Sequence, residues 1–112
     1  METMESKTNG IVMLRLKGKL DASTGPHLQD RLFASIAGGE KLFAIDCWEL
    51  DYISSAGLRV LLVATKQLRN ASGKIVLYAL QAHVKEVFDL ADFSTVLPLL
   101  GSQSEALSSF KN

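Results

Sequence analysis

Hydrophobic and polar residues recur along the chain with two different periods, and the changes between them mark the predicted elements. From Ile11 to Leu20, apolar and polar side chains alternate one by one, which is the period of a strand with one buried face. An amphipathic helix follows, with Pro26 in its first turn and Gly38-Gly39 at its end. The apolar run from Lys41 to Cys47 predicts a buried strand. Because a helix separates these two strands, we expect them to pair in parallel.

The second half of the chain continues the alternation of helix and strand. The longest helix is predicted from Ala56 to Asn70, with Gly73 as its stop, and a buried strand from Lys74 to Leu80 follows. A further helix is expected from Ala82 to Ala91. Three weaker elements complete the pattern: an edge strand near Thr3 to Thr8, a short strand from Thr95 to Leu100, and an amphipathic helix in the tail, where Ser102 and Glu105 have capping-box spacing.

These elements predict one α/β domain over residues 1–112. A chain of 112 residues with 47% hydrophobic residues is long enough for one packed core, and this composition excludes intrinsic disorder. No internal repeat, linker or low-complexity segment divides it.

The charge balance gives no sign of nucleic acid or membrane as a direct partner. Twelve basic residues face twelve acidic ones, and Lys and Arg form no run. The sequence shows no apolar core of a signal peptide and no membrane-spanning stretch, so we expect a cytoplasmic protein. Cys47 is the only cysteine, which excludes an intramolecular disulfide, and its apolar surroundings predict a buried thiol.

Residues that carry catalysis or bind cofactors are scarce. His27 and His83 have no second ligand at metal-binding spacing, and no nucleophile elbow or phosphate-binding glycine loop occurs. We therefore expect no metal, no cofactor and no enzymatic activity. The acids and the lysine that a two-component receiver domain requires are also missing. Three phenylalanines are interpreted as core residues: Phe33, Phe43 and Phe88. Trp48 and Tyr52, beside a strand end, are either partner-contacting aromatics or core or rim packing, and packing is the favoured interpretation.

One segment carries more information than the rest. Three acids, Asp46, Glu49 and Asp51, precede a Ser-Ser-Ala-Gly turn at the start of the longest helix. Ser54 or Ser55 is suited to cap that helix. A hydroxyl at this place is also suited to phosphorylation, because free N–H groups and the helix dipole stabilise an anion there. Capping alone does not choose between the two interpretations.

The run L-D-Y-I-S-S-A-G-L-R-V-L-L, from Leu50 to Leu62, resembles the signature of the STAS family, and in particular of anti-sigma factor antagonists. The segment Gly18-Lys19-Leu20-Asp21 is similar to the family's G-x-L-D, and Ala82 to Asp89 is similar to its third helix. The resemblance covers nearly the whole chain. It implies a small STAS-like fold, with a mixed sheet of four to five strands and about four helices.

The resemblance also implies a function, which is partner switching. The unmodified protein would bind an anti-sigma factor that is also a serine kinase, and phosphorylation would end that binding until a serine phosphatase resets it. Aligning the family's Gly-Leu with Gly57-Leu58 places the phosphoserine on Ser55, with Ser54 as the alternative. The expected oligomeric state is a monomer or a weak dimer.

The residues around this serine suggest a surface that responds to its charge. A phosphate would lie next to Asp46, Glu49 and Asp51 and would oppose an acidic or apolar partner. Arg59, four residues after Ser55, is within reach of that phosphate or is simply a solvated helix residue. The remaining members of the predicted switch surface are Asp21, Ser54, Ala56 and Gly57.

Two other functions remain open at this point. A STAS module that is never phosphorylated would serve as a structural subunit of a sensing or lipid-transport complex, with Ser54 and Ser55 as caps only. A small enzyme or nucleotide binder is the third class, for which serine, aspartate and two unrelated histidines are available.

Overall fold

The computed structural model describes residues 1–93 and 96–111. Five strands and four helices occur in these described residues. Their bounds are β1 Glu2–Thr8, β2 Ile11–Leu20, α1 Gly25–Ala37, β3 Leu42–Ile53, α2 Ser55–Asn70, β4 Lys74–Tyr78, α3 Ala82–Leu90, β5 Leu99–Leu100 and α4 Gln103–Ser108. The predicted α/β class, with a mixed sheet and about four helices, is therefore confirmed.

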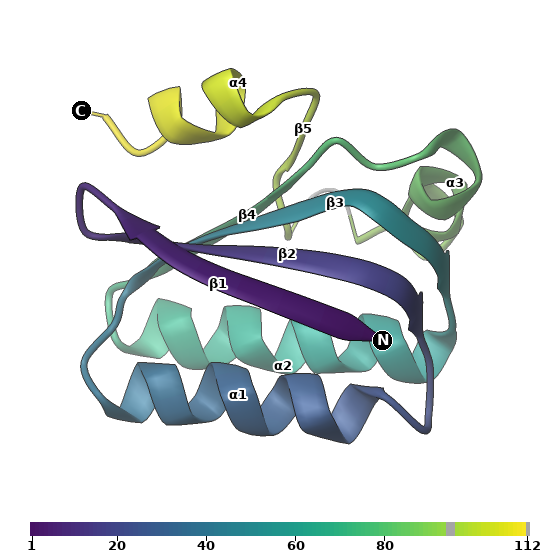
Figure 1. Cartoon of the computed structure of the whole chain (residues 1–112), viewed down its shortest axis with the longest axis horizontal. Helices are drawn as coiled ribbons and strands as arrows, with labels where there is room; N and C mark the ends of the chain where they lie inside the picture. Colours follow the sequence, from purple (N-terminus) through teal and green to yellow (C-terminus); the bar gives the residue numbers. More distant parts are fainter. Residues whose placement is uncertain (94–95, 112) are drawn as a thin grey trace.

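The sheet has the strand order β1-β2-β3-β4-β5, and Figure 1 shows it as the central layer. β1 and β2 form an antiparallel hairpin, while every later neighbour pairs in parallel, as the intervening helices require. Asn9 and Gly10 form the two-residue hairpin loop, and both have positive φ angles, 52° and 79°. An Asn-Gly loop of this kind matches the twist of its strands and sets the register of the β1 edge strand.

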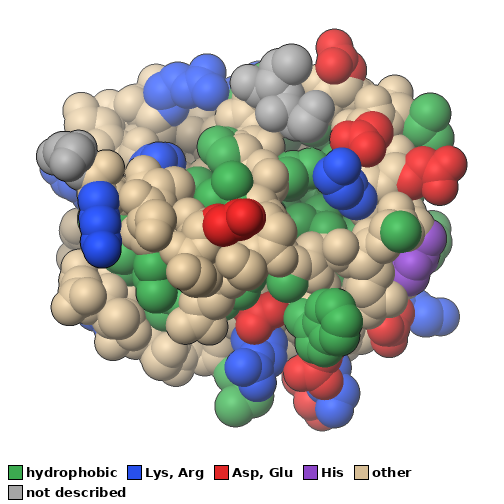
Figure 2. Space-filling model, turned by 90° about the horizontal axis from the view of Figure 1, so that it is seen from above, with side chains coloured by type: hydrophobic (Ala, Val, Ile, Leu, Met, Phe, Trp, Pro, Cys, Tyr) green, Lys and Arg blue, Asp and Glu red, His purple; other side chains and the backbone are tan. Residues whose placement is uncertain are grey.

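The two faces of the sheet are covered unequally. The long helices α1 and α2 lie under one face and enclose the larger core, which includes the fully buried Phe43, Leu61 and Phe88 (Figure 1). The short α4 lies over the other face, where a smaller apolar cluster consists of Ile11, Met13, Ala44, Val76, Tyr78 and Ala106. Figure 2 views the molecule from the α4 side, where acidic and basic side chains lie next to each other rather than in separate areas.

β3 is longer than the sequence pattern predicts, continuing to Ile53 instead of ending at Cys47. Two irregularities in its pairing with β2 give β3 extra residues, one between Asp46 and Glu49 and one between Leu50 and Tyr52. As a result the buried positions after the first irregularity are three residues apart, at Cys47, Leu50 and Ile53. A period of two could not detect this half of the strand, because each bulge shifts the alternation by one residue.

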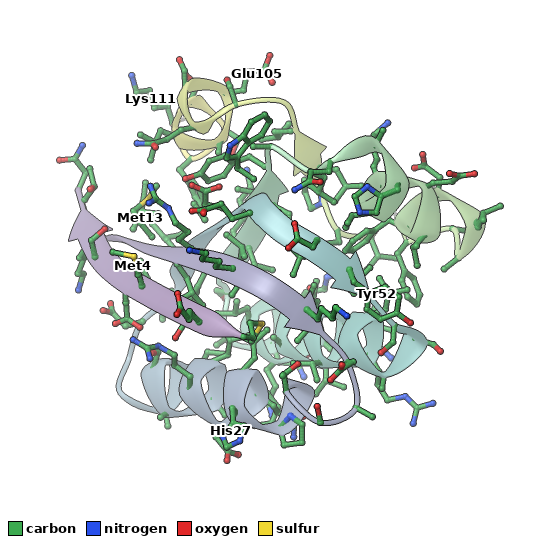
Figure 3. The ribbon with its side chains drawn as sticks, turned by 45° about the vertical axis from the view of Figure 1, so that its right-hand side comes forward. Met4, Met13, His27, Tyr52, Glu105 and Lys111 are labelled. Atoms are coloured by element: carbon green, nitrogen blue, oxygen red, sulfur yellow. The ribbon has the colours of Figure 1, made fainter. Side chains whose placement is uncertain are left out.

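The core interpretation is confirmed for the phenylalanines, whereas Trp48 and Tyr52 lie outside the core. Phe43 and Phe88 are buried and Phe33 packs against the core, but Trp48 and Tyr52 are 68% and 48% exposed. Both lie among the outward residues that the bulges of β3 produce. Figure 3 shows Tyr52 near the far end of β3, well away from Met13 at the start of β2.

Gly73 does not end α2 in the predicted way. Ser72 takes the left-handed conformation, with φ 60°, and Gly73 allows a close approach, because a Cβ there would lie 2.5 Å from the backbone oxygen of Lys41.

The predicted final strand from Thr95 to Leu100 is reduced to Leu99–Leu100, and Thr95 itself lies outside the described residues. Cys47 is buried, as predicted.

Candidate functional site

The two adjacent serines at the start of α2 have different surroundings. Ser54 is the N-cap: it has extended backbone angles, and its Oγ accepts a hydrogen bond from the Gly57 N–H at 3.2 Å. Ser55 is the first helical residue and is exposed. Among the described residues, none is hydrogen-bonded to the Ser55 hydroxyl. One serine therefore stabilises the helix while the other is available for chemistry.

Gly57 fixes where this helix starts. A Cβ at this position would lie 2.6 Å from the Leu20 backbone oxygen and 2.8 Å from Leu20 Cγ, which is too close for any larger residue without movement. The Ser54 N–H also donates to the same Leu20 oxygen at 3.0 Å. These contacts hold the first turn of α2 against the end of β2, directly beside the β2–α1 turn.

Asp21 organises that neighbouring turn. Its Oδ1 accepts from the Ser23 N–H at 2.9 Å, the Ser23 hydroxyl at 2.8 Å and the Thr24 N–H at 3.1 Å. The Ser23 hydroxyl, followed by the two backbone N–H groups, lowers the pKa of the Asp21 carboxyl below its ordinary value of 3.8. Asp21 is thus a fixed negative charge at neutral pH.

Two shallow hollows join Asp21 to the exposed serine. One, of about 520 Å³, lies between the turn residues 21–23 and residues 54–56. The other, of about 420 Å³, extends between the N-terminal turns of α1 and α2, where Pro26 and Gln29 face Ser55 and Arg59. Arg59 is exposed, and no described residue forms an ion pair or hydrogen bond with its guanidinium. The structure therefore brings Asp21, Ser54, Ser55, Ala56 and Arg59 together.

Asp46 lies elsewhere. It is seven residues before the end of β3, roughly 20 Å along the strand, and its carboxylate pairs with Arg15 Nε at 3.4 Å. Burial, followed by the nearby Asp46 charge, raises the pKa of Tyr78 to about 12. Asp46 thus lies between its strand partners Arg15 and Tyr78 on the α4 face of the sheet, far from Ser55.

Glu49 and Asp51 line a third hollow, which they share with Lys17, Trp48 and Gln81 and which contains neither serine. Of the acids predicted beside Ser55, Asp21 shares two hollows with it, whereas Glu49 and Asp51 line a separate one. Asp46 lies farthest away, because β3 carries its residues away from its end at about 3.3 Å per residue.

Neither histidine contributes to the site around Ser55. His27 lies on the outer side of α1 (Figure 3), and His83 Nε2 lies 2.5 Å from the backbone oxygen of Asp51, an oxygen that can only accept. In the described part of the chain, no three side chains of His, Cys, Asp or Glu are grouped so that they could hold a metal ion. None of its helices has the length and apolarity needed to cross a membrane.

Comparison with known proteins identifies the family of this chain. The sequence profile of the STAS domain family matches residues 4–106, from β1 into α4. The chain belongs to the STAS domain family. A relative from Bordetella bronchiseptica, BtrV, which is named as a candidate anti-sigma factor antagonist, is 38% identical over 99% of this chain and 96% of its own length.

Solved STAS structures have the same fold. The crystal structure of a candidate anti-sigma factor antagonist from Thermotoga maritima has a TM-score of 0.94 at 16% identity, covering 98% of this chain and 95% of its own. The anti-sigma factor antagonist SpoIIAA in its unphosphorylated form has a TM-score of 0.75 at 20% identity, covering 96% of each chain. The resemblance read from the sequence is thus confirmed at the level of family and fold.

The sequence did not place Pro26 and Gln29 at the site around Ser55. Pro26 and Gln29 face Ser55 only because α1 packs against α2, with Gly25 fitted against Val60. No local pattern signals that contact. By contrast, Asn9-Gly10 is a readable hairpin signal that sets the edge of the sheet.

Proposed function

We propose that this STAS protein is an anti-sigma factor antagonist that works by partner switching. The unmodified protein binds an anti-sigma factor with serine kinase activity, through the end of the molecule where α1 and α2 begin. Phosphorylation of Ser55 ends the binding and a serine phosphatase restores it. The protein is a non-catalytic, cytoplasmic monomer or weak dimer, and it contacts neither nucleic acid nor membrane directly.

The difference between Ser54 and Ser55 carries this proposal. The Ser54 hydroxyl is engaged as the helix cap, whereas the Ser55 hydroxyl is exposed beside two hollows. A kinase needs an accessible hydroxyl, and a helix N-terminus tolerates the charge that results. The relative named as an antagonist supports an anti-sigma factor as the partner.

The electrostatics of release follow from Asp21. A phosphoserine adds about −1.5 to −2 charges at neutral pH, and these would share a hollow with the fixed carboxylate of Asp21. A partner face that fits the neutral serine would then have to desolvate two adjacent negative groups. The phosphate therefore weakens docking without any rearrangement of the fold.

Phosphorylation and site mapping test the proposal. The protein is incubated with ATP and each serine-kinase anti-sigma factor of its source organism, and its intact mass is measured. We expect a gain of about 80 Da, for one phosphate group, mapped to Ser55. The Ser55→Ala variant should gain no mass and should melt like the unmodified protein.

Ser54→Ala is the matched control. This variant should still be phosphorylated, although loss of the cap should cost about 1 kcal/mol of stability. A phosphate mapped to Ser54 would refute the assignment of the site. No mass gain with any kinase, together with unchanged partner binding by Ser55→Asp, would overturn partner switching in favour of a constitutive structural subunit.

A further inference from the structure

The outer side of β3 displays aromatic and acidic residues that the Ser55 site does not use. Between the buried Cys47, Leu50 and Ile53, the two bulges leave pairs of outward residues: Trp48 with Glu49, and Asp51 with Tyr52. Trp48 is the only tryptophan of the chain, and 68% of it is exposed. Most tryptophans bury a large apolar area, so an exposed one at a strand bulge is a candidate contact residue.

The backbone of Trp48 is held in place by side chains rather than by the strand ladder. Its N–H donates to Asp46 Oδ1 at 3.0 Å, and its carbonyl accepts from Gln81 Nε2 at 2.7 Å. Next to it, His83 Nε2 holds the carbonyl of Asp51. These bonds satisfy backbone polar groups at the bulge and hold the backbone from which the indole projects.

The hollow beside the indole has an excess of negative charge. It measures about 440 Å³ and is lined by Trp48, Glu49, Asp51, Lys17 and Gln81, which together carry two carboxylates and one ammonium group. Lys17 Nζ lies 3.9 Å from Glu49 Oε2, at the outer limit of an ion pair. No described residue forms an ion pair with the Asp51 carboxylate. An aromatic face next to two carboxylates that a single lysine only partly balances suits a cation, and guanidinium in particular.

We infer that Trp48, Glu49 and Asp51 form a second protein-docking surface, which receives an arginine side chain from a partner protein. The guanidinium stacks on the indole and pairs with the two carboxylates, while Gln81 borders the contact. The hollow shares no lining residue with the two hollows around Ser55. An arginine bound at this surface therefore does not occupy the hollows around Ser55.

The single tryptophan makes the surface directly measurable. A blocked hexapeptide with two arginines is titrated into the intact protein, and Trp48 emission and its indole N–H resonance are followed. We expect saturable changes in both, with a Kd on the order of 1 mM. The same peptide with citrulline replacing arginine, which keeps the shape without the charge, should cause no saturable change.

Variants separate this contact from unspecific attraction. Glu49→Gln with Asp51→Asn should weaken arginine-peptide binding about fivefold, since exposed charge pairs are individually weak. Asp30→Asn with Glu86→Gln changes the net charge equally at exposed positions outside the hollow and should leave the Kd unchanged. Trp48→Ala should shift the Tm by no more than about 2 °C, because an exposed side chain contributes little stability.

Three results would overturn the inference: an equal response to the citrulline peptide, equal weakening by both pairs of acid substitutions, or a large loss of stability in Trp48→Ala. Ser55→Ala should bind the peptide like the unmodified protein. Because the titration needs no kinase, its failure would leave the proposed partner switch intact, and failure of phosphorylation would leave this surface intact.

Discussion

The two faces of the sheet differ in how completely helices cover them. On one face, α1 and α2 enclose a large continuous core with many fully buried side chains. On the other, the six-residue α4 covers only a small cluster, and charged and aromatic residues of β2 and β3 remain at the surface. The first face supplies most of the stability, because the hydrophobic contribution grows with the apolar area removed from water.

This difference separates stability from recognition within a small molecule. The α1/α2 face covers the larger core, and the N-terminus of α2 presents Ser55 at the carboxyl end of β3. The half-covered α4 face can display Trp48 because the core beneath it does not depend on that side chain. Four experiments test this division, beginning with the largest expected effect.

Truncating one leucine to alanine on each face should give very different losses of stability. Leu61→Ala, in the larger core, should destabilise by about 3–4 kcal/mol, because Leu61 is fully buried and its truncation leaves a cavity. Leu107→Ala, on the half-buried side of α4, should cost only about 1 kcal/mol. Urea denaturation of both variants measures the difference, and equal losses would contradict the comparison.

Gly57→Ala tests the contact between α2 and the end of β2. The added Cβ would lie 2.6 Å from the Leu20 backbone oxygen, so we expect a loss of about 1–3 kcal/mol by overpacking. Thermal unfolding measures it. Gly38→Ala is the control, because there the nearest atom lies 3.4 Å away. A neutral Gly57→Ala would mean that the start of α2 can shift without cost.

Asp21→Asn should lower the Tm in a pH-dependent way. The lowered pKa means that the carboxylate stabilises the fold above its ordinary pKa of 3.8 and loses this contribution as the pH falls through the lowered value. The Tm difference between the variant and the parent should therefore be largest at neutral pH and shrink in acid. A difference that stays constant with pH would show that charge is not the cause.

Arg59→Ala should have the smallest effect, confined to the phosphorylated form. The unmodified protein should hardly change, because none of the described residues pairs with Arg59, whereas the Ser55-phosphorylated protein should lose at most about 1 kcal/mol. Calorimetry of both forms checks this. Lys66→Ala, an exposed position two turns further along α2, should affect neither form, and equal melting shifts in both forms of Arg59→Ala would exclude the contact.

Several features could be predicted from local pattern. The alternation in β2, the apolar run that opens β3 and the spacing of α2 each report a backbone period and a buried face. The Ser-Ser-Ala-Gly turn marks a helix start for the same local reason, since a cap bonds to its own first turn. The second half of β3 could not be predicted, because its buried positions follow neither the strand period nor the helix period. These positions are Cys47, Leu50 and Ile53.

The sequence by itself determined the order of elements, the STAS signature and the presence of a hydroxyl at the start of α2, because these depend on neighbours within a few residues. Only the tertiary structure decided that Ser54 is the cap and Ser55 is exposed, that Asp21 rather than Asp46 accompanies it, and that Trp48 lies outside the core. The physical reason is that these outcomes depend on contacts between distant segments. The Leu20 oxygen positions Gly57, and the bulges against β2 turn the residues of β3 outward.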